Sequence, residues 1–401
     1  MIPITRPSMG EAEAEAARRA ILSGWISQGP EVAAFELEFA EAVGAPHACA
    51  VSNCTTALHL ALLACGVGPG DEVVTVSHSY IATANAIRYC GATPVFVDIE
   101  ADGFNIDVSQ IESALTGRTR AILCVHQIGM PCDLATIVEI ARRRKIPVIE
   151  DAACAIGGEI FWNGRWEQIG KPHGDIACFS FHPRKVISTG DGGMITTADA
   201  QWDATFRLLR QHGMSVPDTV RHGANRVIFE SYSQLGYNYR MTDIQAAVGR
   251  EQLKRLPQIV EARRALADRY RSLLSSIAGL ELPREPNWAR SNWQSFCVRL
   301  PDGCDQRAVM QKMLDDGVST RRGIMCSHRE QAYSDLPLRA SLARSELAQD
   351  RSIILPLYPE MTAAEQGLVQ AALARACLVE APTTSGESSL QHGRDQIAQR
   401  Q

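Results

Sequence analysis

Short apolar runs alternate with helical segments over the first half of the chain. The runs show no alternation of apolar and polar residues, so they predict strands buried on both faces of a sheet. The predicted strands are residues 48–51, 72–76, 93–97, 119–125, 147–150, 176–181 and 193–197. The predicted helices are residues 11–22, 31–42, 55–65, 81–89 and 134–144. This order favours an α/β domain in which helices flank a mostly parallel sheet.

The pattern changes near residue 250, where one long acidic and basic helix is predicted over residues 251–275. Such a helix would bridge two domains. A smaller α+β region follows, with a predicted strand at 295–300 and a helix at 307–315. The last residues are polar, rich in Gln, Ser and Gly, and predict a disordered tail. We therefore divide the chain into a large domain, a small C-terminal domain and a tail, at residues 1–250, 251–380 and 381–401.

Composition narrows the possible functions. The net charge of −5 over 401 residues argues against nucleic acid or an anionic membrane as a partner. No apolar run is long enough to span a bilayer, and no signal-peptide core is evident. The twelve cysteines are scattered without a CxxC pair. They predict reduced thiols in a cytoplasmic protein and disfavour a metal site.

Lys185 is the strongest candidate for chemistry. It follows the predicted strand that contains Ser180, and Asp151 ends another apolar strand upstream. A lysine amine holds an aldehyde as a Schiff base, and a carboxylate keeps a pyridine nitrogen protonated. These residues therefore predict a pyridoxal phosphate site. A surface lysine, or an aspartate paired with an arginine or a helix N-terminus, is the alternative.

Three further motifs follow strands. Residues 53–56 open a helix with small and hydroxyl residues, which suits a phosphate or a plain helix cap. Tyr80 follows a strand and would either stack on a flat ring or pack in the core. Asn238 and Arg240 precede a small-residue helix at 244–249, where they would reach an anion or belong to a loop and cap.

Together these motifs resemble the DegT/DnrJ/EryC1/StrS family of sugar aminotransferases, which are fold type I pyridoxal phosphate enzymes. The resemblance covers residues 1 to 375. The runs that carry it are residues 24–30, 67–73, 91–98, 147–151, 180–193 and 236–249. The fold implied is a large domain with a mostly parallel, seven-stranded type of sheet, followed by a smaller α+β domain.

The resemblance also implies roles for individual residues. Lys185 matches the Schiff-base lysine, Asp151 the partner of the pyridine nitrogen, and Tyr80 the aromatic residue that stacks on the ring. The residues that match phosphate contacts are Thr55, Thr56 and Ser180. Asn238 matches an asparagine that reaches the cofactor phosphate of a neighbouring subunit, which implies a homodimer with shared active sites.

Some positions depart from the family pattern. Cys154 stands where Gln or His commonly lies near the phenolic oxygen of the cofactor. Residues 77–79 lack the proline common before the aromatic residue. His328 falls near a substrate-side histidine within unusual flanking residues. The relatives that carry histidine in place of the lysine remove a hydroxyl instead, and Lys185 argues against that chemistry.

The function that we predict is amino transfer from an amino acid, glutamate in the family, to a nucleotide-linked keto sugar by a ping-pong mechanism. Candidates for the sugar diphosphate are Arg184, Arg240, Arg321, Arg322 and His328. Sugar dehydration, amination of a cyclitol ketone and a non-enzymatic regulatory role remain alternatives. A nicotinamide oxidoreductase is disfavoured, because no G-x-G-x-x-G turn follows the first strand.

Overall fold

The computed structural model describes residues 1–216, 220–221 and 224–378. Its centre is a seven-stranded sheet in the order β1-β9-β8-β5-β4-β2-β3. The strands are β1 (His47–Val51), β2 (Glu72–Val76), β3 (Thr93–Val97), β4 (Thr119–Val125), β5 (Val148–Asp151), β8 (Ile176–Ser180) and β9 (Gly193–Thr197). β9 runs antiparallel to β1 and β8, and the other pairs are parallel. The predicted mostly parallel α/β sheet is confirmed.

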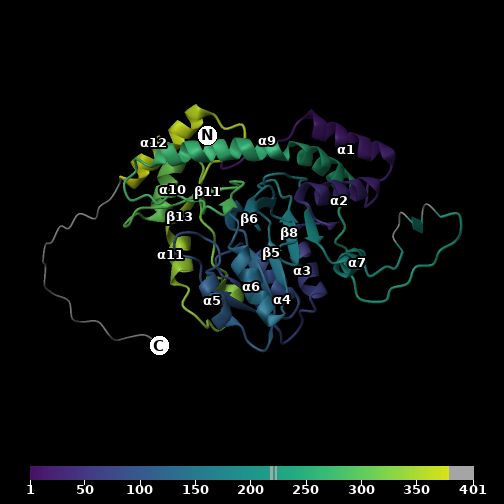
Figure 1. Cartoon of the computed structure of the whole chain (residues 1–401). Coiled ribbons are helices and arrows are strands. Elements are labelled where there is room, and N and C mark those ends of the chain that lie inside the picture. The colour runs from purple at the N-terminus through teal and green to yellow at the C-terminus, as the bar shows by residue number, and fades with distance from the viewer. Residues whose placement is uncertain (217–219, 222–223, 379–401) are drawn as a thin grey trace, which may run out of the picture.

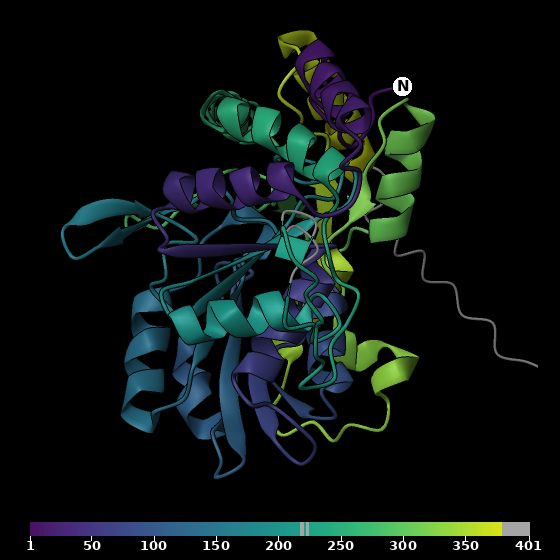
Figure 2. The same cartoon turned by 90° about the vertical axis from the view of Figure 1, so that its right-hand side faces the viewer.

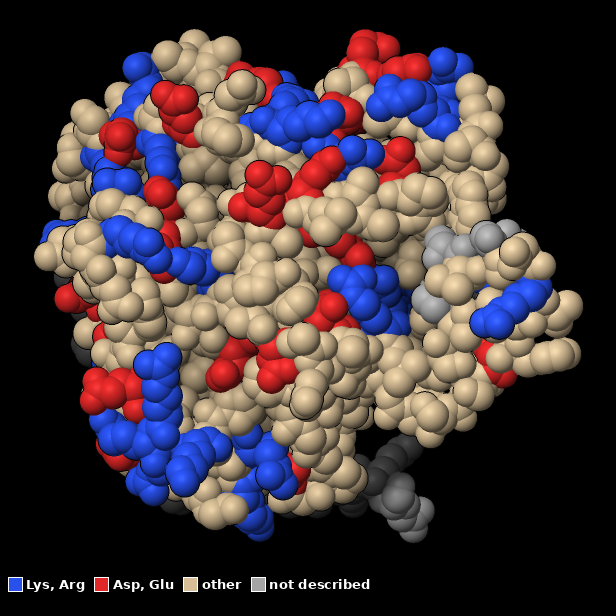
Figure 3. Space-filling model, turned by 45° about the vertical axis from the view of Figure 1, so that its right-hand side comes forward, with Lys and Arg blue, Asp and Glu red and all other residues tan. Residues whose placement is uncertain are grey.

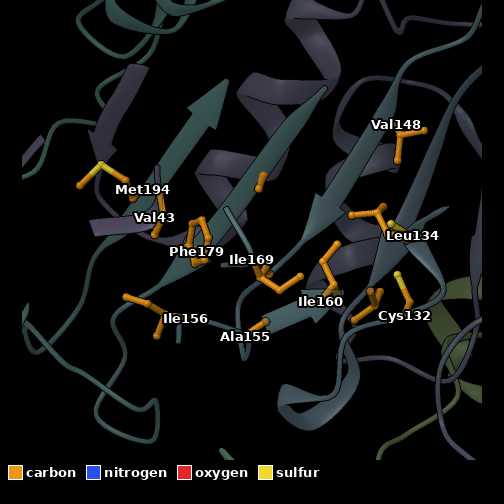
Figure 4. Close-up of a cluster of buried hydrophobic side chains, with 14 of the residues drawn as sticks. Val43, Cys132, Leu134, Val148, Ala155, Ile156, Ile160, Ile169, Phe179 and Met194 are labelled. Carbon is orange, nitrogen blue, oxygen red and sulfur yellow. The ribbon is translucent and has the colours of Figure 1, made fainter. Parts of the chain in front are cut away.

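Both faces of this sheet are buried, as the unbroken apolar strands predicted. Alternate residues of β4 enter two separate apolar clusters, with Ile122 in one and Leu123 in the other. The first cluster, part of which Figure 4 shows, includes Phe179 and Met194. The helices that supply the first cluster include α2 (Pro30–Val43), α5 (Val108–Ala114) and α6 (Leu134–Arg144). Those that supply the second are α3 (Cys54–Ala64), α4 (Ala82–Tyr89) and α7 (Ala200–Leu209).

Helix α9 (Asp243–Leu274) crosses the top of the molecule and lies beside α1 (Glu11–Ser23), as Figures 1 and 2 show. The sequence predicted two helices here, and the structure has one. Gly249 does not end a helix. A Cβ at this position would lie 2.7 Å from Cζ of Phe35, so the glycine instead lets α9 pack closely on α2.

The C-terminal part holds a second sheet, in the order β11-β13-β12. Its strands are β11 (Phe296–Arg299), β12 (Arg321–Arg322) and β13 (Ser352–Leu355). The helices of this part are α10 (Gln306–Asp315), α11 (Ala343–Arg351) and α12 (Ala363–Cys377), with short η2 (Ser327–Arg329) and η3 (Gln331–Tyr333). The remaining elements are η1 (Gln127–Gly129) and a sheet of β6 (Glu159–Trp162), β7 (Arg165–Gln168) and β10 (Ala289–Arg290).

The predicted domain boundary at residue 250 lies inside α9 and stays a prediction. The predicted tail, 381–401, lies outside the described residues. Within the described ranges, no helix is long and apolar enough to cross a membrane. On the face drawn in Figure 3, acidic and basic side chains are interspersed rather than gathered into a single-sign surface.

Candidate active site

Several of the predicted site residues lie at the carboxyl ends of neighbouring strands of the large sheet. Ser180, at the end of β8, pairs with Gly193 of β9, which pairs in turn with Val51 at the end of β1. Asp151 ends the neighbouring parallel strand β5. The structure therefore brings Asp151, Ser180 and the start of α3 to the carboxyl ends of the parallel strands, where ligands bind on such sheets.

Asp151 is buried and holds two hydrogen bonds from neutral donors. Its Oδ2 accepts from Thr83 Oγ1 at 2.7 Å, and its Oδ1 accepts from the Ala153 N–H at 3.2 Å. Burial raises the pKa of Asp151, and the two hydrogen bonds only partly oppose that effect. A buried carboxylate whose hydrogen bonds do not offset the cost of burial is stabilised by a cation that donates an N–H, such as a pyridinium nitrogen.

Lys185 lies on the turn after β8, half-buried. Its backbone N–H donates to the His182 carbonyl at 2.8 Å, and its Nζ lies 3.1 Å from Cys154 Sγ. Burial acts to lower the pKa of Lys185, but the interactions with the neighbouring Cys154, Cys54 and Asp151 side chains outweigh burial, so the pKa is raised. The structure thus brings Lys185 and Cys154 into direct contact beside Asp151.

The start of α3 is a capped helix N-terminus close to β9. Asn53 Oδ1 accepts from the Thr56 N–H at 3.0 Å, and the Thr56 hydroxyl donates to the Asn53 carbonyl at 2.7 Å. A Cβ on Gly193 would lie 2.6 Å from the Asn53 carbonyl carbon, so only glycine permits this approach. The capping interpretation of residues 53–56 is confirmed. A phosphate contact by Thr55, Thr56 or Ser180 stays a prediction.

Tyr80 lies beyond the end of β2 with 58% of its surface exposed. The alternative of a core tyrosine is therefore wrong, and a ring free to stack on a ligand remains. Stacking on the cofactor itself stays a prediction.

Asn238 and Arg240 lie on an extended segment that runs beside the end of α7. The Tyr237 N–H donates to the Leu209 carbonyl at 2.7 Å, and the Tyr239 carbonyl accepts from the Ser52 N–H at 2.8 Å. The two tyrosine rings stack 4.9 Å apart. Asn238 lies between them in sequence and is exposed, while Arg240 is half-buried. The segment is thus fixed directly beside the start of α3.

His328 links the small sheet region to the segment that precedes Tyr80. Its Nδ1 lies 2.6 Å from Ser77 Oγ, and its Nε2 lies 2.9 Å from Glu346 Oε1. Arg321 and Arg322 are exposed on β12. A substrate role for these three residues, and for the exposed Arg184, stays a prediction.

The sequence did not reveal two residues that support the site. Thr83 is buried and donates a hydrogen bond to Asp151. The sequence marks it only as a hydroxyl residue four positions after Ser79, with which it also forms a hydrogen bond. The Asn292 amide donates to the carbonyls of Cys154 at 2.7 Å and Ile156 at 2.8 Å. Nothing local marks Asn292, because its partners lie about 140 positions away in sequence.

Comparisons with known proteins agree with this geometry. The model of the "DegT/DnrJ/EryC1/StrS aminotransferase family" matches residues 7–374. The chain is 36% identical over 367 residues to the spore coat polysaccharide biosynthesis protein SpsC of Bacillus subtilis, covering 90% of this chain and 93% of that protein.

Solved structures agree as well. The aminotransferase TlmJ of Streptoalloteichus hindustanus superposes with a TM-score of 0.86 at 33% identity, covering 94% of this chain and 99% of that one. The proposed sugar aminotransferase Spr1654 of Streptococcus pneumoniae, in its PMP form, gives 0.88 at 25% identity, covering 94% and 99%. Spr1654 has also been solved in its PLP form.

The residues present fit pyridoxal phosphate. A lysine amine, a buried carboxylate in need of a cation and a helix N-terminus lie at one sheet edge, as the aldehyde, pyridine nitrogen and phosphate of this cofactor require.

Proposed function

Because the chain belongs to the DegT/DnrJ/EryC1/StrS aminotransferase family, we propose that it moves an amino group from glutamate to a nucleotide-linked keto sugar. It is a sugar aminotransferase that depends on pyridoxal phosphate. The donor, the nucleotide and the residue roles below are proposals. The observation that supports the residue roles is the Lys185 amine beside Cys154, close to the buried Asp151 carboxylate.

Pyridoxal phosphate, when bound, draws electrons from the Cα–H bond of an amino substrate. Asp151 keeps a proton on the pyridine nitrogen, because a buried carboxylate is stabilised by the cation it faces. Thr83 and Ala153 orient that carboxylate through their hydrogen bonds. Lys185 would hold the aldehyde of the cofactor. Once a donor has released it, its amine would act as the base that takes a proton from the donor Cα and as the acid that returns it.

The two half-reactions share these residues, since the keto acid leaves before the keto sugar enters. Lys185 would then move a proton in the reverse direction. Because the first product leaves before the second substrate binds, we expect ping-pong kinetics. Ser180 and the start of α3 would hold the cofactor phosphate through hydroxyl and N–H donors. Arg240 and His328 are the residues that we propose for binding the sugar diphosphate.

We also propose a homodimer. Residues 212–216 and 224–236 belong to an arm that projects beyond α7 in Figure 1. Gly213 and Gly236 allow the backbones at the two ends of the arm to lie in close contact, because a Cβ on Gly236 would lie 2.0 Å from the Gly213 nitrogen. The arm exposes 82% of Val227 and 90% of Phe229, which favours a second copy of the chain as its partner. Asn238, at the base of the arm, would then reach the partner's phosphate site.

The test combines turnover with oligomeric state. Purified chain is mixed with glutamate and a panel of nucleotide keto sugars, and the amino sugar is detected by mass spectrometry, with Lys185→Ala as the control. We expect 2-oxoglutarate and amino sugar in equal amounts. A product that has lost water without gaining nitrogen would overturn the proposal. Phe229→Asp is expected to shift the mass in solution from dimer to monomer.

A further inference from the structure

An amine and a thiol face each other at the centre of the site. Lys185 Nζ lies 3.1 Å from Cys154 Sγ, and both side chains are half-buried. Of the twelve cysteines, eight are buried and Cys154 is one of four that are partly exposed. An oxidant can therefore reach the Cys154 sulfur, and the Lys185 nitrogen is the nucleophile in direct contact with it.

We propose that Cys154 is a site of reversible oxidation, at which a hydroperoxide links the Cys154 sulfur to the Lys185 nitrogen. Hydrogen peroxide oxidises the thiol to a sulfenic acid and releases one water. Solvent water takes one proton from the Lys185 ammonium group. The neutral amine then attacks that sulfur: an S–N bond forms, the S–O bond breaks, and a second water leaves with a further proton from the amine. Two molecules of a thiol reductant reverse the change. They restore the Cys154 thiol and the Lys185 amine and are themselves oxidised to a disulfide.

The surroundings favour this product over a disulfide. Cys54 is the other cysteine close to Lys185, but it is buried, its Sγ donates to the Cys178 carbonyl at 3.6 Å, and burial raises its pKa well above the ordinary value. Cys54 therefore stays protonated and unreactive. Asn292 holds the Cys154 backbone carbonyl at 2.7 Å, so the Cys154 sulfur stays in reach of Lys185.

The consequence for catalysis rests on the proposed function. An S–N bond occupies the amine that binds the aldehyde, so the linked protein does not bind pyridoxal phosphate covalently. Protein loaded with pyridoxal phosphate has no free Lys185 amine and is protected. The pyridoxamine form leaves Lys185 free and is sensitive. Peroxide would therefore inactivate the enzyme mainly between its two half-reactions.

Peptide mass spectrometry on the full-length chain tests the proposal. Cofactor-free protein and protein loaded with pyridoxal phosphate are treated with hydrogen peroxide, alkylated and digested. We expect the Cys154 and Lys185 peptides to appear joined, lighter by two hydrogens than their sum, in the cofactor-free sample only. Dithiothreitol is expected to separate them. Cys65, which is partly exposed and far from Lys185 in sequence, serves as an internal control that stays alkylated.

Cys154→Ala and Lys185→Ala should each abolish the joined peptide, and Cys54→Ser should leave it unchanged. A disulfide between Cys54 and Cys154 that persists in Lys185→Ala would overturn the proposal, as would oxidation of Cys154 with no link. The two proposals fail separately. A link without any pyridoxal phosphate absorbance refutes the cofactor role alone, and cofactor binding without a link refutes the modification alone.

Discussion

Thr83→Val removes the hydrogen bond from the Thr83 hydroxyl to the Asp151 carboxylate, together with its contact to Ser79 Oγ, and keeps the shape of the side chain. Thr83 is buried, its Oγ1 donates to Asp151 Oδ2 at 2.7 Å, and valine has nearly the same shape. Of these two donors to the Asp151 carboxylate, the variant keeps the Ala153 N–H, at 3.2 Å. The carboxylate is then less well oriented and less stable as an anion, so it holds a proton on the pyridine nitrogen less firmly.

The expected size follows from the hydrogen bond. A hydrogen bond to a charged group contributes about 1.5–3 kcal/mol. Since about 1.4 kcal/mol is a tenfold change in rate, the kcat/KM for glutamate should fall by roughly 10- to 150-fold. The unfolding free energy should change much less than it would for a core cavity, because valine leaves no void.

The assay follows the half-reaction with glutamate in a stopped-flow spectrophotometer at saturating cofactor. Thr83→Ser retains the hydroxyl and serves as the matched control, with an expected loss below about fivefold. Thr83→Val with the rate of the native chain would refute the role that we give to the Thr83–Asp151 hydrogen bond. Equal losses in both variants would attribute the effect to packing rather than to the hydroxyl.

Three further changes have defined outcomes. Gly193→Ala places a Cβ 2.6 Å from the Asn53 carbonyl carbon and should weaken pyridoxal phosphate binding about tenfold or more, as equilibrium dialysis would show. Glu36→Leu leaves the buried Arg210 without its carboxylate partner and should lower the unfolding free energy by about 3–5 kcal/mol in denaturant titrations. Burial raises the pKa of Asp151 in the cofactor-free protein. The free energy of unfolding should therefore fall as the pH rises from acidic to neutral and Asp151 loses its proton. Bound pyridoxal phosphate offsets that loss. The increase in Tm that it causes should therefore grow with pH in the native chain and should not depend on pH in Asp151→Asn.

The sheet could be predicted because each of its strands carries the signal of burial on both faces. Runs such as Thr119–Val125 leave no polar face, and only a sheet between helices covers them. The strands β6 and β7 were missed, since their mixed polar residues, Glu159 and Arg165 among them, are typical of loops as well. The break expected near Gly249 was wrong, because a small residue marks close packing as readily as a helix end.

For the site, the sequence indicated the residues that follow strands, but not those that hold them in place. Asp151 and Ser180 could be placed together, because the carboxyl ends of parallel strands share an edge. Asn292 could not, since its hydrogen bonds to the Cys154 turn depend on how the later part of the chain packs on the sheet. The contact between Lys185 and Cys154 likewise needs the conformations of two turns, which no periodicity encodes.

The visible absorption spectrum of the purified protein, recorded before and after addition of glutamate, tests the central claim most directly. We predict a band from pyridoxal phosphate bound to Lys185, its conversion by glutamate to the pyridoxamine phosphate band, and the loss of the initial band in Lys185→Ala. A protein that stays colourless when pyridoxal phosphate is supplied, or a Lys185→Ala variant with an unchanged band, would contradict the account.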